Sequence, residues 1–155
     1  MSGRIAARLT ELGIDLPIPA PPQGAYVPWV KSGALLFISG QLPLGSKGLM
    51  YLGTVGQEIN LDDARRAARL AAINVLAQTA AALEGDLDRV KRVVKVGGFV
   101  NAVPGFTQHP EVVNGASELF AEIFGEAGRH ARAAVGVSSL PRNVCVEIEA
   151  IIEVA

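Results

Sequence analysis

The segment RHARAAVGVSSLPRNVCVEIEA, residues 129–150, contains two strand-like runs on either side of a turn. Arg132 interrupts the first run, and Glu147 and Glu149 interrupt the second, which continues to Val154. Successive side chains of a strand point to opposite faces of its sheet. The glutamates therefore fall on one face of the last strand, and we expect the opposite, uniformly apolar face to contact helices.

In the preceding strand, Ala133, Val135 and Val137 form a similar apolar set, which predicts that Arg132 lies on the other face. We therefore expect Arg132 and the glutamates to share the face of the sheet that carries no helices. One interpretation is a solvated face with cross-strand ion pairs. The other is a cleft in which Arg132 binds a carboxylate through two charge-assisted hydrogen bonds while a glutamate holds water or moves a proton.

The remaining chain predicts an α+β protein with a mixed sheet and two main helices packed on one face. Apolar spacing indicates a short helix in residues 2–13, and the prolines of residues 15–26 indicate an extended arm. The clearest helix begins after Asn60, a plausible N-cap, and ends at Gly85. The other expected elements are two short strands in 26–40, a small strand near 49–52, a strand in 92–103 with a bulge or close approach at Gly97–Gly98, and a second main helix in 109–128.

Length and composition predict a single domain, residues 1–155, that associates with further copies of itself. Half of the residues are apolar and only 19% are charged. A small monomer with this composition exposes apolar surface, which contacts between subunits would bury. The net charge is −1 and no basic block is present, which argues against a nucleic-acid partner. The cluster Arg65, Arg66 and Arg69 is better explained as an exposed helical turn with local ion pairs.

The sequence also predicts a cytoplasmic location without a membrane partner. There is no signal-peptide pattern, and the longest apolar stretches are too short to span a bilayer. The single cysteine, Cys145, fits a reducing compartment, and we interpret it as a small apolar filler. His130 lies close to Arg132 but is most simply a turn residue. We find no metal-ligand spacing, nucleophile elbow or P-loop.

Two motifs resemble the reactive intermediate deaminase family, also called RidA/YjgF. The first is RAAVGVSSLPRNVCVEIEA at residues 132–150, and the second is YVPWVKSGALLFISGQLP at residues 26–43. The segments DLDRVKRVVKVGGFVN and EVVNGASELFAEIFG match the blocks between them. The resemblance covers residue 25 to the C-terminus, so residues 1–25 are an extra N-terminal helix and proline-rich arm. It implies a chorismate-mutase-like fold that forms a homotrimer with its sheets facing inward and its sites between subunits.

The resemblance also implies roles for five residues. Arg132 would bind a substrate carboxylate, and Glu147 would position or activate the hydrolytic water. Tyr26 would close over the ligand, Gly40 would offer backbone groups, and Asn114 would help to line the cleft. The implied reaction is hydrolysis of a 2-imino acid to a keto acid and ammonia, as in 2-iminobutanoate/2-iminopropanoate deaminases. This reaction requires neither a metal nor an organic cofactor.

Two other functions remain open at this point. Some relatives are described as endoribonucleases or translation inhibitors, although the near-neutral charge argues against RNA binding. The second alternative is that the chain forms a non-catalytic trimer of unknown function that binds small carboxylates. This second alternative is favoured by Ala134, where the deaminases often have cysteine, and by the Val-Pro-Trp that follows Tyr26, where they usually have Gln-Gly.

Overall fold

The computed structural model describes all residues from Met1 to Ala155 and places five strands in one sheet, in the order β1-β2-β7-β5-β6. Neighbouring strands are antiparallel except β5 and β6, which are parallel, so the sheet is mixed. Its strands are β1 (Trp29–Ser32), β2 (Leu35–Gln41), β5 (Val90–Asn101), β6 (Ala131–Val137) and β7 (Val146–Val154). β1 and β6 form its two edges. The predicted hairpin and both C-terminal strands are confirmed.

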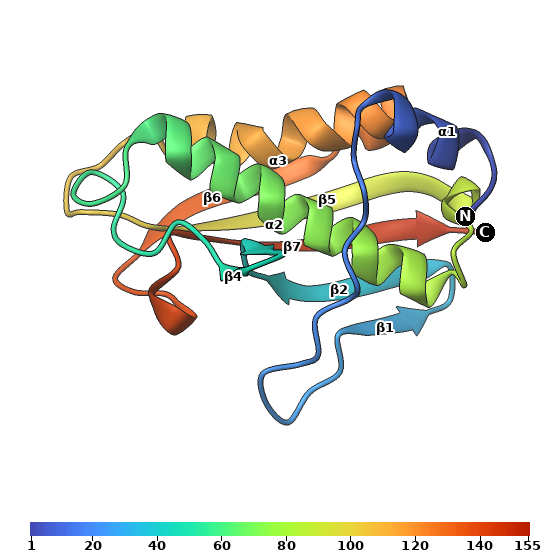
Figure 1. Ribbon diagram of the computed structural model, residues 1–155, viewed down its shortest axis with the longest axis horizontal. Coiled ribbons are helices and arrows are strands. Elements are labelled where there is room, and N and C mark those ends of the chain that lie inside the picture. Colours follow the sequence, from blue (N-terminus) through green and yellow to red (C-terminus); the bar gives the residue numbers. More distant parts are fainter.

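Two long helices cover one face of the sheet, and the opposite face is open (Figure 1). α2 (Leu61–Ala82) begins after Asn60, whose Oδ1 accepts a hydrogen bond from the backbone N–H of Asp63 at 2.8 Å, as predicted for an N-cap. α3 (His109–Phe124) has Pro110 in its first turn. Short 3-10 turns are η1 (Leu87–Arg89), η2 (Gly125–Gly128) and η3 (Pro141–Asn143). The predicted α+β architecture is confirmed.

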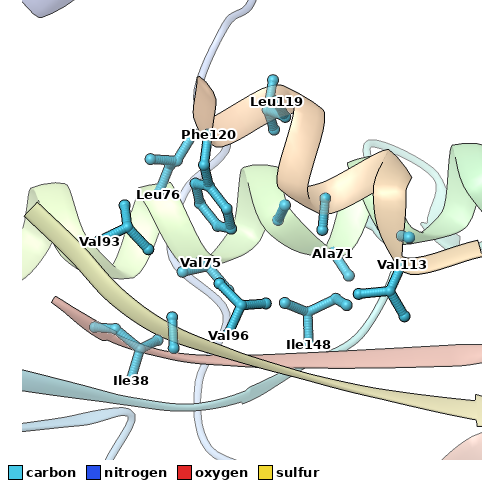
Figure 2. Packing of buried hydrophobic residues seen from close by; sticks show 14 of the residues in the cluster. Ile38, Ala71, Val75, Leu76, Val93, Val96, Val113, Leu119, Phe120 and Ile148 are labelled. Atoms are coloured by element: carbon cyan, nitrogen blue, oxygen red, sulfur yellow. The ribbon is translucent and has the colours of Figure 1, made fainter. Parts of the chain in front are cut away.

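The hydrophobic core lies between the two helices and the sheet. Phe120 of α3 is fully buried together with Val75 of α2 and Val96 of β5, and Figure 2 shows these side chains meeting in one layer. The last strand and the residues just before it contribute a buried set of alternating side chains: Val144, Val146, Ile148, Ala150, Ile152 and Val154. The apolar face predicted for this strand is therefore confirmed.

Glycines allow the helices to approach each other and the sheet closely. A Cβ atom at Gly115 of α3 would collide with the backbone of Arg65 in α2, and one at Gly98 of β5 would collide with Val113 of α3. Of the two predictions for Gly97–Gly98, the close approach is therefore correct. The irregular register of β5 lies earlier, between Val90 and Lys95.

The predicted orientation of β6 is wrong. Arg132 points toward α3, with its Nη1 2.8 Å from Oδ1 of Asn114, and Ala134 contacts the core. Val135 lies instead on the open face and is 46% exposed. The pattern misleads because both faces of the sheet carry large apolar side chains, including the exposed Phe37 of β2, so hydrophobicity does not identify the inner face of an edge strand. Arg132 and the glutamates consequently lie on opposite faces.

Residues 42–59 form a loop that contains a small two-stranded ribbon. Its strands are β3 (Leu44–Gly45) and β4 (Gly48–Leu49). The strand expected near residues 49–52 therefore lies mostly before that range, and Leu52 makes only an isolated bridge to Val144.

The N-terminal helix α1 (Arg4–Glu11) lies at the end of the molecule where the C-terminus is also found (Figure 1). Ile5 and Leu9 are buried in the core, which confirms the predicted helix and its inward face. The carboxylate of Asp88 accepts hydrogen bonds from the backbone N–H groups of Ile5 at 2.8 Å and Arg4 at 2.9 Å, and these bonds lower the pKa of Asp88. None of the helices combines the length and hydropathy that a membrane span requires.

Candidate active site

Glu147 lies on the open face of the sheet, on the central strand β7, with its carboxylate against Gly40 of β2. Gly40 lies at the register shift between Ile38 and Gln41. A Cβ atom at position 40 would collide with the Glu147 carboxylate, so glycine alone leaves room for it. The close approach of these two predicted site residues therefore depends on the missing side chain at Gly40.

The Glu147 carboxyl group is a suitable group for proton transfer. Burial raises its pKa, and the nearby carboxylate of Glu149 raises it further. A carboxyl group whose pKa is moved toward neutrality both accepts and releases protons more readily at physiological pH. Glu149 itself is exposed, so it acts as a source of negative charge rather than as a second buried acid.

A cavity of about 150 Å³ opens beside Glu147 and Gly40. Tyr26 forms part of its wall, and its Oη accepts a hydrogen bond from the backbone N–H of Gln23 at 3.0 Å. The cavity is lined by Ala20, Pro21, Pro22, Gln23, Tyr26, Pro28, Gly40, Gln41, Leu42, Leu44, Leu49, Asn74, Pro141 and Glu147. Three of the predicted site residues thus surround one cavity.

Arg132 is half-buried between the edge strand β6 and helix α3. Its Nη1 donates hydrogen bonds to Oδ1 of Asn114 at 2.8 Å and to Oγ of Ser117 at 3.1 Å. The structural ion pair with Glu147 or Glu149 that the sequence left open is not formed, because no ion pair of the chain includes Arg132. Both hydrogen bonds use Nη1, so Nη2 and Nε remain available for an external acceptor.

His130 supports this arrangement from the turn before β6. Its Nδ1 lies 2.6 Å from the carbonyl oxygen of Gly128, and its Nε2 lies 2.8 Å from Oγ of Ser117. A proton on Nδ1 is donated to the carbonyl oxygen of Gly128, so the unprotonated Nε2 accepts a hydrogen bond from the Ser117 hydroxyl group. The Oγ atom of Ser117 in turn accepts a hydrogen bond from Arg132. Burial is the main effect that lowers the pKa of His130, and the positive charge of Arg132 lowers it further. The hydrogen bond to the carbonyl oxygen of Gly128 raises the pKa but does not outweigh these effects, so the neutral ring is favoured.

One chain does not bring Arg132 and Glu147 together. Val96 pairs with both Arg132 and Ala150, and Glu147 lies three residues from Ala150 along β7. Two strand spacings and a three-residue offset place the Cα atoms of Arg132 and Glu147 roughly 14 Å apart, with side chains on opposite faces. The predicted residues therefore form two groups, Arg132 with Asn114 and Glu147 with Gly40 and Tyr26.

The sequence did not reveal the contributions of Ser117 and Gln78. Ser117 bridges His130 and Arg132, and Gln78 of α2 donates to the carbonyl oxygen of Ala20 at 2.8 Å. A weak signal existed for Gln78, because a polar residue in the charge-free part of a long helix is normally paired when it is buried, and Gln78 is 1% exposed. Cys145 is fully buried in the core, and burial raises its pKa to about 12, in line with the expected filler role.

The mixed sheet with two helices on one face and a long parallel crossover defines a chorismate-mutase-like α+β protein. The chain belongs to the YjgF family, whose model, described as "YjgF/chorismate_mutase-like, putative endoribonuclease", matches residues 6–153.

Relatives resemble the chain over nearly its whole length. Protein TCP17 of Trypanosoma cruzi is 50% identical over 153 residues, which is 98% of this chain and 95% of that protein. A 2-iminobutanoate/2-iminopropanoate deaminase of Dermatophagoides farinae is 29% identical over 140 residues, 90% of this chain and 93% of the deaminase.

Two solved structures have the same fold, including the N-terminal part. A protein of unknown function from Agrobacterium tumefaciens is 52% identical with a TM-score of 0.91, over 97% of this chain and 92% of that chain. A "putative endoribonuclease" from Shewanella oneidensis is 34% identical with a TM-score of 0.94, over 98% of this chain and 100% of that chain.

Proposed function

We propose that this protein hydrolyses 2-imino acids to 2-keto acids and ammonia in the cytoplasm, at clefts between the subunits of a homotrimer. The observation that carries the proposal is an unpaired, half-buried Arg132 whose guanidinium is oriented by two α3 side chains. The named activity of the Dermatophagoides relative supports the choice of substrate.

The separation of the two groups of site residues supports a cleft between subunits. In a 2-imino acid the carboxylate is bonded directly to the imine carbon that water attacks, so groups roughly 14 Å apart on opposite faces cannot serve one molecule. A second copy that docks on the open face would bring its own Arg132 to the Glu147 cavity. Val30, Phe37 and Val135 leave that face with exposed apolar side chains, as expected for a surface covered by another subunit. The number of three subunits rests on the resemblance to the family.

The proposed hydrolysis balances without any further reactant. Arg132 holds the substrate carboxylate, and Glu147 accepts a proton from water as the water oxygen attacks the imine carbon. The π electrons of the C=N bond move to nitrogen, which takes the proton from Glu147 to give a carbinolamine. Glu147 then accepts the hydroxyl proton of this intermediate and passes it to nitrogen, so that the C–N bond breaks, ammonia leaves and the keto group forms. The raised pKa of Glu147 suits both halves of this proton transfer.

A direct test compares hydrolysis of 2-iminobutyrate, generated in situ, by the wild type and by Arg132→Ala. We expect kcat/KM to fall by about 10²-fold or more in the variant, because the carboxylate loses a charge-assisted partner. The matched control is Arg129→Ala, since Arg129 is exposed and pairs only with the exposed Glu126. An equal fall in kcat/KM in the two variants, or the absence of hydrolysis by the wild type, would contradict the proposal.

A subunit-mixing experiment tests where the site lies. Arg132→Ala and Glu147→Gln subunits are each expected to be inactive, but a mixed trimer places an intact Arg132 beside an intact Glu147 from another copy. Random mixing is expected to restore about one quarter of the wild-type activity, the share of interfaces that receive both intact residues. No recovery in mixed trimers that have been verified by mass would contradict a site that is shared between subunits.

A non-catalytic protein that binds small carboxylates is the second candidate, and Ala134 beside Arg132 favours it. In that case keto acids raise the unfolding temperature of the wild type, but not of Arg132→Ala, without any turnover. RNA binding is disfavoured because the arginine cluster of α2 is neutralised. Its ion pairs are Arg65–Glu118, Arg66–Asp63 and Arg69–Glu122.

A further inference from the structure

The N-terminal arm, residues 14–28, forms part of the wall of the cavity beside Glu147. It leaves α1, crosses α2 and reaches β1, as the blue segment in front of the green helix in Figure 1 shows. The arm residues that line the cavity are Ala20, Pro21, Pro22, Gln23, Tyr26 and Pro28. Proline fixes its own backbone φ, so three prolines in this wall reduce the number of conformations available to it.

Side chains from the folded body hold the arm in place. Gln78 of α2, which is 1% exposed, donates from Nε2 to the carbonyl oxygen of Ala20 at 2.8 Å. Arg142, in the turn before β7, donates to Oε1 of Gln23 at 3.4 Å. On the opposite wall, Asn74 donates from Nδ2 to the carbonyl oxygen of Leu44 at 2.9 Å. The cavity is therefore bounded by fixed segments on both sides.

The size and lining of the cavity define what it accepts. A dry cavity of about 150 Å³ in another protein, an engineered lysozyme, holds benzene, so this one has room for a group of about six heavy atoms. Prolines and leucines supply much of its surface, and Glu147 is its only charged lining residue. A compact apolar group is therefore accommodated, whereas an acidic group would meet the Glu147 carboxylate, and no lining residue of this chain is a cation that could pair with it.

We propose that this cavity is a side-chain specificity subsite, which selects 2-imino acids and 2-keto acids with compact apolar side chains and rejects those with acidic side chains. The inference rests on the proposed function, because the ligand carboxylate must bind Arg132 of another subunit for its side chain to enter here. The arm is the specificity-determining element, and Ala20 is the residue whose size sets the depth of the subsite.

The test measures binding of four keto acids by calorimetry: pyruvate, 2-oxobutyrate, 4-methyl-2-oxopentanoate and 2-oxoglutarate. For the wild type we expect affinity to rise by about fourfold for each added CH₂ that is buried, and 2-oxoglutarate to bind at least about tenfold more weakly than 4-methyl-2-oxopentanoate. In Ala20→Leu the larger side chain occupies the cavity. The affinity for 4-methyl-2-oxopentanoate is therefore expected to fall by at least about tenfold, while the affinity for pyruvate changes by less than about twofold.

Two further variants complete the test. Ala25→Leu makes the same change at an exposed arm residue outside the cavity, and it should leave the order of affinities unchanged. Leu42→Ala enlarges the cavity from its other wall and should favour 3-phenyl-2-oxopropanoate over 2-oxobutyrate. Affinities that do not depend on the side chain, or that Ala20→Leu and Ala25→Leu alter equally, would overturn the subsite.

The outcomes separate this inference from the proposed hydrolysis. If Ala20→Leu reorders the keto acids but no imine is hydrolysed, the subsite stands and catalysis fails. If imines are hydrolysed at relative rates that neither their side chain nor Ala20→Leu affects, hydrolysis stands and the subsite fails. If no keto acid binds at all, the subsite is refuted.

Discussion

Nη1 of Arg132 lies 2.8 Å from Oδ1 of Asn114, so helix α3, rather than a carboxylate, orients the arginine of the edge strand. A neutral acceptor fixes the direction of a guanidinium without cancelling its charge. The guanidinium is therefore held in one orientation and keeps its full charge for an anionic ligand.

Asn114→Ala should weaken ligand binding more than turnover. Removing the Oδ1 acceptor frees the Arg132 side chain, and a hydrogen bond to a charged group is typically worth about a tenfold change in affinity or somewhat more. We expect KM for 2-iminobutyrate to rise by about that factor while kcat changes little. Steady-state kinetics check this, with Glu118→Ala, an exposed residue of the same helix, as the control. A fall in kcat alone would contradict this role.

The pKa of His130 should respond to ligands at Arg132. Burial lowers this pKa, and the positive charge of Arg132 lowers it further. A carboxylate bound to Arg132 offsets that charge, so we expect the pKa of His130 to rise when pyruvate binds and pyruvate to bind more tightly in mild acid. NMR titration of the His130 ring with and without pyruvate measures the shift. An unchanged titration curve at saturating pyruvate would place the ligand elsewhere.

The same residue predicts the pH dependence of stability. The pKa of His130 is lower in the folded protein than in the unfolded chain, where the pKa of histidine is about 6.5. The unfolded chain thus binds the proton more readily, and the free energy of unfolding should fall as the pH drops below that value. Denaturant titrations between neutral pH and mild acid should show this fall, and His130→Asn should reduce it. A fall of equal size in the variant would assign it to other groups.

Glu147→Gln should stabilise the folded protein at neutral pH, although we expect it to remove the proposed activity. Burial raises the pKa of Glu147 in the folded state, so the charged form is penalised above that pKa and the penalty disappears as the pH falls through it. The variant should therefore unfold at a higher temperature than the wild type at neutral pH, with the difference shrinking in acid. Its kcat should fall by about 10²-fold or more. Lower stability at neutral pH would show that the carboxylate forms favourable contacts.

Gly115→Ala should lower the free energy of unfolding by about 1–3 kcal/mol, because the new methyl group meets backbone rather than a movable side chain. The obstacle is the main chain of Arg65 in α2, against which α3 is packed. Gly24→Ala is the matched control, since its methyl group would meet only the ring of Tyr26 at 3.7 Å. Urea unfolding measures both, and equal stability of the two variants would mean that the helices separate without cost.

Local patterns predicted the main helices and the strands of the large sheet, whereas the site required long-range geometry. The N-cap at Asn60 and the alternation around Glu147 depend on neighbouring residues, and both are confirmed. The orientation of Arg132 was predicted wrongly because the faces of an edge strand differ little in hydrophobicity. The Ser117–His130 pair joins residues 13 positions apart, and nothing in a single sequence signals such a contact. The roles of Tyr26, Gly40, Asn114, Arg132 and Glu147 in binding or catalysis remain predictions.

The N-terminal arm has a consequence for how such proteins diversify. Residues 14–28 lie outside every strand and helix of the fold, and the side-chain hydrogen bonds of Gln78 and Arg142 help to fasten them. Ile14 and Leu16 pack against the hydrophobic core, but no hydrophobic residue of 17–28 does, so substitutions in this later part are less coupled to the stability of the sheet. An engineer is therefore able to exchange residues 17–28 as a cassette, and to ask whether ligand preference follows the exchanged segment, while Glu147 and Arg132 stay untouched.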